Sequence, residues 1–466
     1  MIRTTRARVV ATGARLVAGI VVSAACVAGA VIAIPAAWPT IAHVPEGATV
    51  KPVAGATRLT CTGAFLALGR DSSQASQLSV AGTPSVVSGA AGGSEVTPAE
   101  IGVTGVSGAT VAPGFTAAPD GRDPAQAAAA QSVSLSDDDL SGFAASACRP
   151  PSMESWIVGG AGTTGSNDVL QIANPGAVTA TVTFTEYGSA GGTHSSELVV
   201  PAGTQSSVPL AAGSAGESTP VVKVTSSGAP VVAALQSSLI RTLDPVGIDV
   251  QDAIAQPEKA FSLLGVRALV GSNNDDNAST AVRLLAPDAD ATVTLQPRSA
   301  ADGRRVGDPK TVKLTAGQVG SVNFSALKPG LYAIDVTATA PVVAAAWQTT
   351  GSVKGSDFAW MTPAPEITGS TAFAVADGPA PQLHVQNGSD QATTVELTPV
   401  RGGAVQRVTL QPDGAATVAL DAFTTYTLAS PTPVRAAVVF SGPGKLAGYP
   451  VWATDAAAAP ITVYQR

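Results

Sequence analysis

A threefold repeat in the C-terminal two-thirds of the chain limits most strongly what it can fold into. A segment of the form x-Pro-Val-x-Ala-Ala occurs at Ala229–Ala234, at Ala340–Ala345 and at Thr432–Ala437. The prolines lie 111 and then 92 residues apart, close to the roughly 100 residues of an immunoglobulin-like sandwich. We therefore expect three copies of one module.

The copies agree at further landmarks, always in the same order. An alternating strand ends in a turn at Leu170–Pro175, Val282–Pro287 and Leu383–Gly388; a β-branched stretch follows at Val182–Phe184, Val293–Leu295 and Val395–Leu397; and a turn precedes another strand at Ala202–Gly203, Ala316–Gly317 and Pro412–Asp413. Agreement at several positions is typical of an internal repeat. We place the modules at 151–255, 256–365 and 366–466.

Apolar and polar residues alternate along these strands, which predicts that one face packs in a core and the other meets water. Ile172 and Val293 are expected core positions. No sustained helical periodicity follows the N-terminal segment, so a parallel α/β sheet is disfavoured. The expected fold class is all-β, with three tandem immunoglobulin-like antiparallel β-sandwich modules.

The N-terminus is basic and then apolar. Four arginines precede an apolar run from Leu16 to Trp38, and no acidic residue occurs before Glu46. A run of this length approaches the ~20 residues that span a bilayer, and the arginines favour a cytoplasmic N-terminus. We predict a cytoplasmic tail over 1–15, a single-pass transmembrane anchor over 16–38, and a juxtamembrane linker over 39–57.

This prediction places the protein in the cell membrane, with the bulk of the chain extracytoplasmic. A cleaved signal peptide is the alternative to the anchor, and lipidation at Cys26 is a weaker one. Removing the four arginines from the net charge of −7 leaves about −11 for the exported part. That balance argues against nucleic acid and anionic membrane surfaces as partners.

Cys61 and Cys148 form an even pair outside the predicted anchor, and an exported chain would join them in a disulfide. The bond brackets an N-terminal region, 58–150, that is partly of low complexity and rich in Ser, Ala, Gly and Thr. Its short apolar runs could add strands to the first module. A disordered stalk over 85–119 is the competing interpretation.

Motifs that suggest chemistry have structural interpretations here. Gly160–Gly165 has the dinucleotide-binding spacing, but an alternating strand follows where the helix should begin, which predicts a turn. Asn273–Asn277 spaces oxygen ligands as a calcium loop does, without its glycine and glutamate; a solvated loop is favoured over loose calcium binding. His43, His194 and His384 lie far apart in the sequence. We predict no catalytic, cofactor or metal site.

Trp156, Trp360 and Trp452 each lie near the edge of a module. In a chain with only 4% aromatic residues, large side chains are expected to fill the cores. The alternative is a ligand platform, because exposed aromatic rings on β-sandwiches bind sugars.

The basic N-terminal segment, Cys61, Cys148 before Ser155–Gly160, and the strand-turn at Leu170–Pro175 resemble an uncharacterised family of actinobacterial membrane-anchored extracytoplasmic proteins. The resemblance covers nearly the whole chain. It implies a family of unknown function, with no active site to carry over and with a loose link to envelope polysaccharide assembly.

Three functions are compatible with these observations. The first is a non-catalytic, membrane-tethered envelope scaffold or accessory factor whose partner is another envelope protein. The second is a protein that binds cell-wall polysaccharide. The third is a glycoside hydrolase that uses two dispersed carboxylates, which would lie roughly 5 to 10 Å apart in a cleft. The absence of a catalytic signature favours the first.

Overall fold

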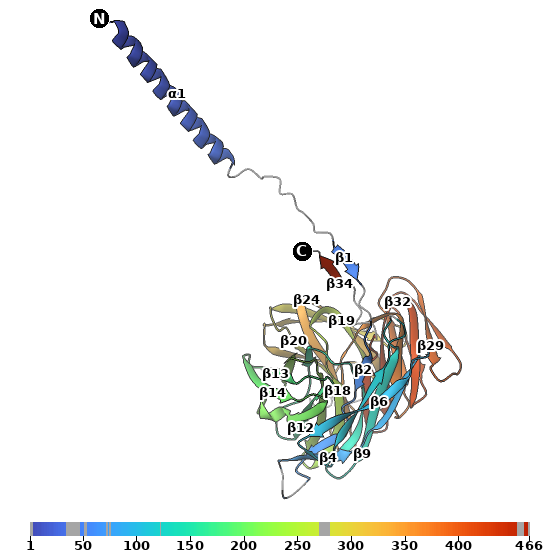
Figure 1. The fold of residues 1–466 in the computed structure, drawn as a ribbon. Helices are drawn as coiled ribbons and strands as arrows, with labels where there is room; N and C mark the ends of the chain where they lie inside the picture. Colours follow the sequence, from blue (N-terminus) through green and yellow to red (C-terminus); the bar gives the residue numbers. More distant parts are fainter. Residues whose placement is uncertain are drawn as a thin grey trace. The chain divides into compact units, whose positions relative to one another are not determined.

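The structure is a computed structural model that describes residues 3–33, 47–50, 54–70, 73, 76–121, 123–269, 280–453 and 461–464. The chain divides into two compact units, Met1–Lys51 with Pro460–Arg466, and Pro52–Ala459. Strands dominate the described residues, as the sequence predicted, and α1 is their one α-helix (Figure 1).

The small unit contains helix α1 (Arg3–Ala33) and a two-stranded antiparallel sheet of β1 (Gly47–Val50) and β34 (Ile461–Tyr464). Within the described part of the chain, no helix combines the length and the apolar character that crossing a membrane requires. The predicted anchor over 16–38, of which residues 34–38 lie outside the described residues, and the predicted cell-membrane localisation are therefore wrong. The prediction counted apolar residues without weighing their size, and much of α1 is Ala, Gly and Ser.

The large unit contains a first repeat over residues 154–252, built of two sheets. Strands pair in the order β11 (Glu154–Ile157), β16 (Val221–Ser227), β13 (Ala180–Tyr187), β14 (Thr193–Val200) in one sheet, and β18 (Asp244–Asp252), β17 (Val232–Arg241), β12 (Ser166–Asn174), β15 (Thr204–Pro209) in the other. The short 3-10 helix η1 (Leu210–Ala212) follows β15.

The second repeat, over residues 258–361, has the same pairing order. One sheet runs β19 (Glu258–Ala268), β24 (Gly330–Thr349), β21 (Ala291–Ser299), β22 (Lys310–Leu314), and the other runs β25 (Phe358–Met361), β24, β20 (Ala281–Leu285), β23 (Val319–Asn323). The short strand β26 (Pro363–Ala364) pairs with β19.

The third repeat, over residues 366–450, repeats the order again. One sheet runs β27 (Glu366–Val375), β32 (Thr424–Gly442), β29 (Thr393–Pro399), β30 (Gln406–Leu410), and the other runs β33 (Lys445–Pro450), β32, β28 (Gln382–Asn387), β31 (Ala415–Ala419). Figure 1 shows these strands in orange to red. Beyond β33, Ile461–Tyr464 pairs with β1 instead.

The repeated proline motif marks the place where the chain passes from one sheet to the other. In the second and third repeats a single long strand, β24 or β32, joins both sheets, with Pro341 or Pro433 at the crossing. In the first repeat the crossing at Pro230 separates β16 from β17. Proline has no N–H to contribute to a ladder, so it suits the point where pairing changes.

Each repeat has its own apolar core between its sheets. Ile172 and Val293, the predicted core positions, are both fully buried. Burial of such side chains stabilises a fold by about 25 cal/mol per Å² of apolar surface. The alternation read from the sequence therefore identifies the core-facing side of these strands.

The N-terminal region forms strands, including over residues 85–119, where a disordered stalk was the competing interpretation of the sequence. They are β2 (Thr57–Thr60), β3 (Phe65–Leu68), β4 (Leu78–Gly82), β5 (Ser85–Ala90), β6 (Val96–Thr104), β7 (Val106–Ser107), β8 (Val111–Ala117), β9 (Ala127–Ser136) and β10 (Ser141–Ala147). Strand β6 pairs in parallel with β15, so β6, β8 and β2 widen a sheet of the first repeat. Cys61 and Cys148 form the predicted disulfide.

One buried carboxylate joins this region to all three repeats. Asp357, just before β25, accepts backbone N–H groups from Phe143 of β10 at 2.9 Å, Ile248 of β18 at 3.1 Å and Leu446 of β33 at 3.0 Å. A Cβ on Gly142, at φ +146°, would lie 2.5 Å from its Oδ1. The absence of a side chain at Gly142 is what lets the backbone reach the carboxylate.

His384 of β28 joins the third repeat to the second. Its Nδ1 accepts the N–H of Gly265 at 3.0 Å, which places the proton of the neutral ring on Nε2. Burial lowers the pKa of His384 to about 3, although the nearby Asp335 carboxylate opposes that shift. The imidazole is therefore neutral in the folded protein across the physiological range.

Replacing Asp357 with Ala should destabilise the large unit by at least about 3 kcal/mol, because three buried N–H groups lose their acceptor and each costs roughly 1–3 kcal/mol. Asp357→Asn keeps one acceptor oxygen and should lose less. Urea denaturation followed by circular dichroism measures both. Asp390→Ala, an exposed aspartate, is the matched control, and an equal loss in it would contradict the role of Asp357.

Removing the disulfide by Cys61→Ser should cost about 4–5 kcal/mol by the chain-entropy relation, since the bond closes a loop with a sequence separation of 87 residues. Cys26 is a free, exposed cysteine, so Cys26→Ser should leave the denaturation midpoint unchanged. Equal midpoints for the two variants would show that the bond contributes nothing.

His384→Asn should remove one component of acid sensitivity, because Asn retains an acceptor for the N–H of Gly265 and does not titrate. With a folded pKa near 3 and an unfolded value near 6.5, His384 contributes stability that is present above pH 6.5 and lost as the pH falls. Between pH 6.5 and 4.5 the unaltered protein should lose about 2–3 kcal/mol more than the variant. The exposed His194 provides the control, since His194→Asn should show the same pH dependence as the unaltered protein.

Candidate functional site

A cavity of about 370 Å³ lies where the first repeat meets the second. The loop before β12 and strands β12, β17, β20, β24 and β25 contribute to its wall. Seven hydroxyl side chains line it: Thr163, Ser166, Ser218, Thr219, Ser237, Ser238 and Ser321. We call it the inter-repeat cavity.

Arg283, in the middle of β20, is the buried cation of this cavity. Its Nη1 donates to the carbonyl oxygens of Gly160 and Pro220, each at 2.9 Å, and its guanidinium lies 4.8 Å from the centre of the Trp360 ring. Burial lowers the pKa of Arg283 to about 10, against the raising effect of Asp168 and Glu217. The second repeat thus inserts a charged side chain into the first.

Asp168 of β12 is the buried acidic residue of the same lining. Its Oδ2 accepts the N–H of Ala161 at 2.7 Å. Burial raises the pKa of Asp168 to about 6, while the N–H of Ala161 and the charge of Arg283 oppose the shift. Asp168 and Arg283 therefore both line the cavity without a direct ion pair between them, and Arg241 adds a second cation to the lining.

The Gly160–Gly165 loop shapes one wall, and β12 follows it directly, so the motif is the turn that the alternating pattern predicted. Gly160 has φ +72°, and a Cβ there would lie 2.8 Å from Leu210 and 3.1 Å from Asp168. Glycine tolerates both this backbone conformation and the close packing. The loop places the carbonyl oxygen of Gly160 where it accepts a hydrogen bond from Arg283. It does not present the backbone N–H groups of a helix N-terminus, which a dinucleotide-binding loop offers to a phosphate.

Aromatic rings complete the lining. Trp347 and Phe358 stack with their centroids 6.3 Å apart, and Trp360 lies opposite Trp347 in the β24–β25 ladder. Hydroxyl groups, the charged side chains Asp168, Arg241 and Arg283, and flat rings together suit a polyhydroxylated ligand with apolar C–H faces. Among the described residues, no cluster of three potential metal ligands occurs.

The structure separates the three tryptophans named from the sequence. Trp156 and Trp360 join one buried cluster between the first two repeats, with exposed fractions of 2% and 7%. Trp156 donates its Nε1–H to Glu154 at 3.0 Å and does not line the inter-repeat cavity. Trp452 is half-buried elsewhere, beneath the guanidinium of Arg149. The candidate calcium loop Asn273–Asn277 and His43 lie outside the described residues.

Sequence reasoning missed Arg283 and Asp168. Arg283 occupies the same place in its repeat as Gln171 and His384 do in theirs, one residue into the strand-turn landmark. All three polar side chains are buried. The sequence signal that could have identified Arg283 is the recurrence of a polar residue at this one position of each repeat, among apolar neighbours.

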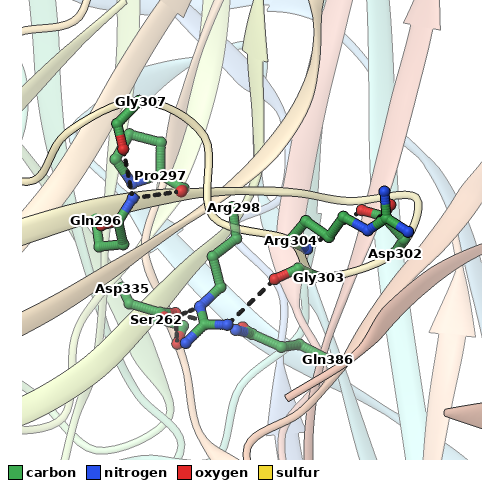
Figure 2. A network of polar contacts seen from close by, with 10 residues as sticks. All are labelled: Ser262, Gln296, Pro297, Arg298, Asp302, Gly303, Arg304, Gly307, Asp335 and Gln386. Carbon is green, nitrogen blue, oxygen red and sulfur yellow. Dashed lines mark hydrogen bonds and ion pairs between the residues drawn. The ribbon is translucent and has the colours of Figure 1, made fainter. Parts of the chain in front are cut away.

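A second polar network joins the second and third repeats. Figure 2 shows Asp335 of β24 receiving hydrogen bonds from Ser262 at 2.7 Å and Gln386 at 3.0 Å, together with an ion pair from Arg298. Arg298 also donates to the carbonyl of Gly303 at 3.1 Å. Because Asp335 is surrounded by donors from the protein itself, we interpret this network as structural.

Comparisons with known proteins supply no function. No curated protein matches the chain. Among solved structures, chicken CNTN1 FN1-FN3 domains show 11% identity and a TM-score of 0.13, covering 81% of this chain and 98% of that one. A tetra-tandem repeat from the extending region of a large adhesion protein shows 13% identity and a TM-score of 0.11, covering 80% and 98%. These scores are too low to support an argument.

A family model described only as a family of unknown function does match, over residues 102–423, well over half of the chain. The match bears out the resemblance to an uncharacterised family and adds no activity, location or source organism. The chain belongs to the family of unknown function DUF5719.

Proposed function

We propose that the protein is a non-catalytic binding protein whose inter-repeat cavity takes a polyhydroxylated ligand, such as a segment of cell-envelope polysaccharide. The observation that carries the proposal is the lining, in which seven hydroxyls surround a buried Arg283 and Asp168 beside Trp347 and Trp360. Its volume of about 370 Å³ falls within the roughly 300–1,000 Å³ of small-molecule sites.

The chemistry of the wall favours binding over hydrolysis. Asp168 is the one carboxylate among the residues that line this cavity. A glycoside hydrolase of the usual kind needs two carboxyl groups, roughly 5 to 10 Å apart, across the scissile bond. A single carboxyl group already engaged with the N–H of Ala161 supports ligand orientation instead.

The scaffold role is a second candidate, and the connections between repeats favour it. Asp357, Arg283 and His384 each make buried hydrogen bonds between different repeats. Such contacts support a rigid body that could present a surface to an envelope protein. We further propose that each repeat is an immunoglobulin-like sandwich, on the basis of its two antiparallel sheets of four strands.

The test of glycan binding uses the full chain, soluble oligosaccharides released from bacterial cell walls, and isothermal titration calorimetry. Trp347→Leu should weaken binding about tenfold, which corresponds to roughly 1.4 kcal/mol, because a stacking surface is lost from the cavity. Trp156→Phe is the matched control outside the lining and should bind within twofold of the unaltered protein.

No measurable binding at millimolar oligosaccharide would overturn the glycan proposal and leave the scaffold role as the better explanation. An equal loss in Trp347→Leu and Trp156→Phe would show that binding, where it occurs, does not use the inter-repeat cavity. Circular dichroism of both variants verifies that the comparison is made between folded proteins.

A further inference from the structure

A second cavity, of about 590 Å³, lies between the N-terminal region and the third repeat. Its walls are mostly alanine and proline side chains, with Phe373 and Tyr449 from the third repeat. Two charged residues line it, Arg58 and Arg149, and both are cationic; no acidic residue is among those that line it. We call it the Arg149 cavity.

The backbone of Arg149 is held firmly. It follows Cys148 of the disulfide, and it exchanges two hydrogen bonds with Thr60, each of 2.9 Å. The main chain at Arg149, from which the guanidinium extends, therefore has a defined position in the cavity wall. Cys148 of the disulfide lines the Arg149 cavity, whereas neither cysteine of the disulfide lines the inter-repeat cavity.

The polar atoms of this wall are incompletely paired. The Arg149 guanidinium carbon lies 3.1 Å from the centre of the Trp452 ring. Neither Arg149 Nη1 nor Trp452 Nε1, both buried, has a hydrogen-bond acceptor in the described structure. Buried donors without acceptors are costly, so an acceptor supplied by a ligand would be favoured here.

The charge of the cavity lining also favours an anionic ligand. Burial lowers the pKa of Arg149 to about 9, and Asp252, which raises it, makes no ion pair with it in the described part of the chain. An anion bound near the guanidinium would stabilise its charged form. The cavity lining contains two positive charges and no acidic residue; burial raises the pKa of the nearby Asp252 to about 7, which reduces the negative charge that an anion would meet there.

We propose that the Arg149 cavity binds an anionic amphiphile, with a carboxylate or phosphate head at Arg149 and an alkyl chain along the alanine-rich wall. Apolar walls without a series of hydroxyls do not suit a sugar, and the absence of acidic lining residues does not suit a cation. A free fatty acid and an acyl chain with a phosphate head share this chemistry.

The experiment titrates the full chain with octanoate, decanoate and dodecanoate below their micelle concentrations, and follows heat and tryptophan fluorescence. Affinity should rise about fourfold per added methylene, because each buried methylene contributes a constant increment. Decanol, the matched neutral molecule, should bind at least tenfold more weakly than decanoate. Decyl phosphate distinguishes the two head groups: tighter binding than decanoate assigns the site to phosphate-headed lipids, and weaker binding to fatty acids.

Arg149→Met retains the apolar stem and removes the charge. It should bind decanoate at least tenfold more weakly and leave decanol binding unchanged, whereas Arg241→Met, an arginine of the inter-repeat cavity, should bind decanoate normally. If Arg149→Met does not fold, the comparison of decanoate with decanol binding to the unaltered protein still tests the proposal. Equal affinities for the two, or no binding of either, overturn the proposal.

Discussion

The architecture depends on one buried carboxylate at the place where the repeats meet. Asp357 holds the N–H groups of Phe143, Ile248 and Leu446, which come from the N-terminal region, the first repeat and the third repeat. Burial raises the pKa of Asp357 well above its ordinary value, even though these donors oppose the shift. Removing water from a carboxyl group is costly unless donors replace it. Strands β10, β18 and β33 must therefore come together at Asp357. This contact links the repeats in a unit whose described residues include no α-helix.

Each repeat uses a buried polar side chain at the same strand position in its contact with the preceding part of the chain, but the type of side chain differs. Gln171, Arg283 and His384 occupy equivalent strand positions, and each is a polar side chain at an otherwise apolar landmark. Arg283 reaches carbonyls of the first repeat, and His384 accepts an N–H from the second. Gln171 donates to Gln236, which in turn pairs with the backbone of Leu66 in the N-terminal region. Each repeat thus contacts the part of the chain before it, and Arg283 also lines a cavity at its junction.

Local patterns in the sequence predicted the features that depend on local geometry. Alternation identified strands and core positions such as Ile172, and the even pair Cys61 and Cys148 identified the disulfide. The sequence did not predict features that arise from pairing over long distances, such as the parallel contact of β6 with β15, the pairing of β1 with β34, or the approach of Asp168 to Arg283. The membrane anchor failed for a different reason, because small residues in α1 add to the length of an apolar run and little to its hydrophobicity.

The two cavities of the large unit differ in the kind of ligand that their linings favour. In the inter-repeat cavity, carbonyl oxygens accept hydrogen bonds from Arg283 and Asp168 lies in the same lining, so a ligand there gains from many weak hydroxyl contacts and from stacking. In the Arg149 cavity, the guanidinium has an unpaired donor and no acidic neighbour in the lining, so a ligand gains from one strong charged contact and from apolar burial. These demands are opposite, and no single small molecule meets both. Asp357 connects the two sites, because it directly precedes β25, which lines the inter-repeat cavity, and accepts N–H groups from β10 and β33, which line the Arg149 cavity.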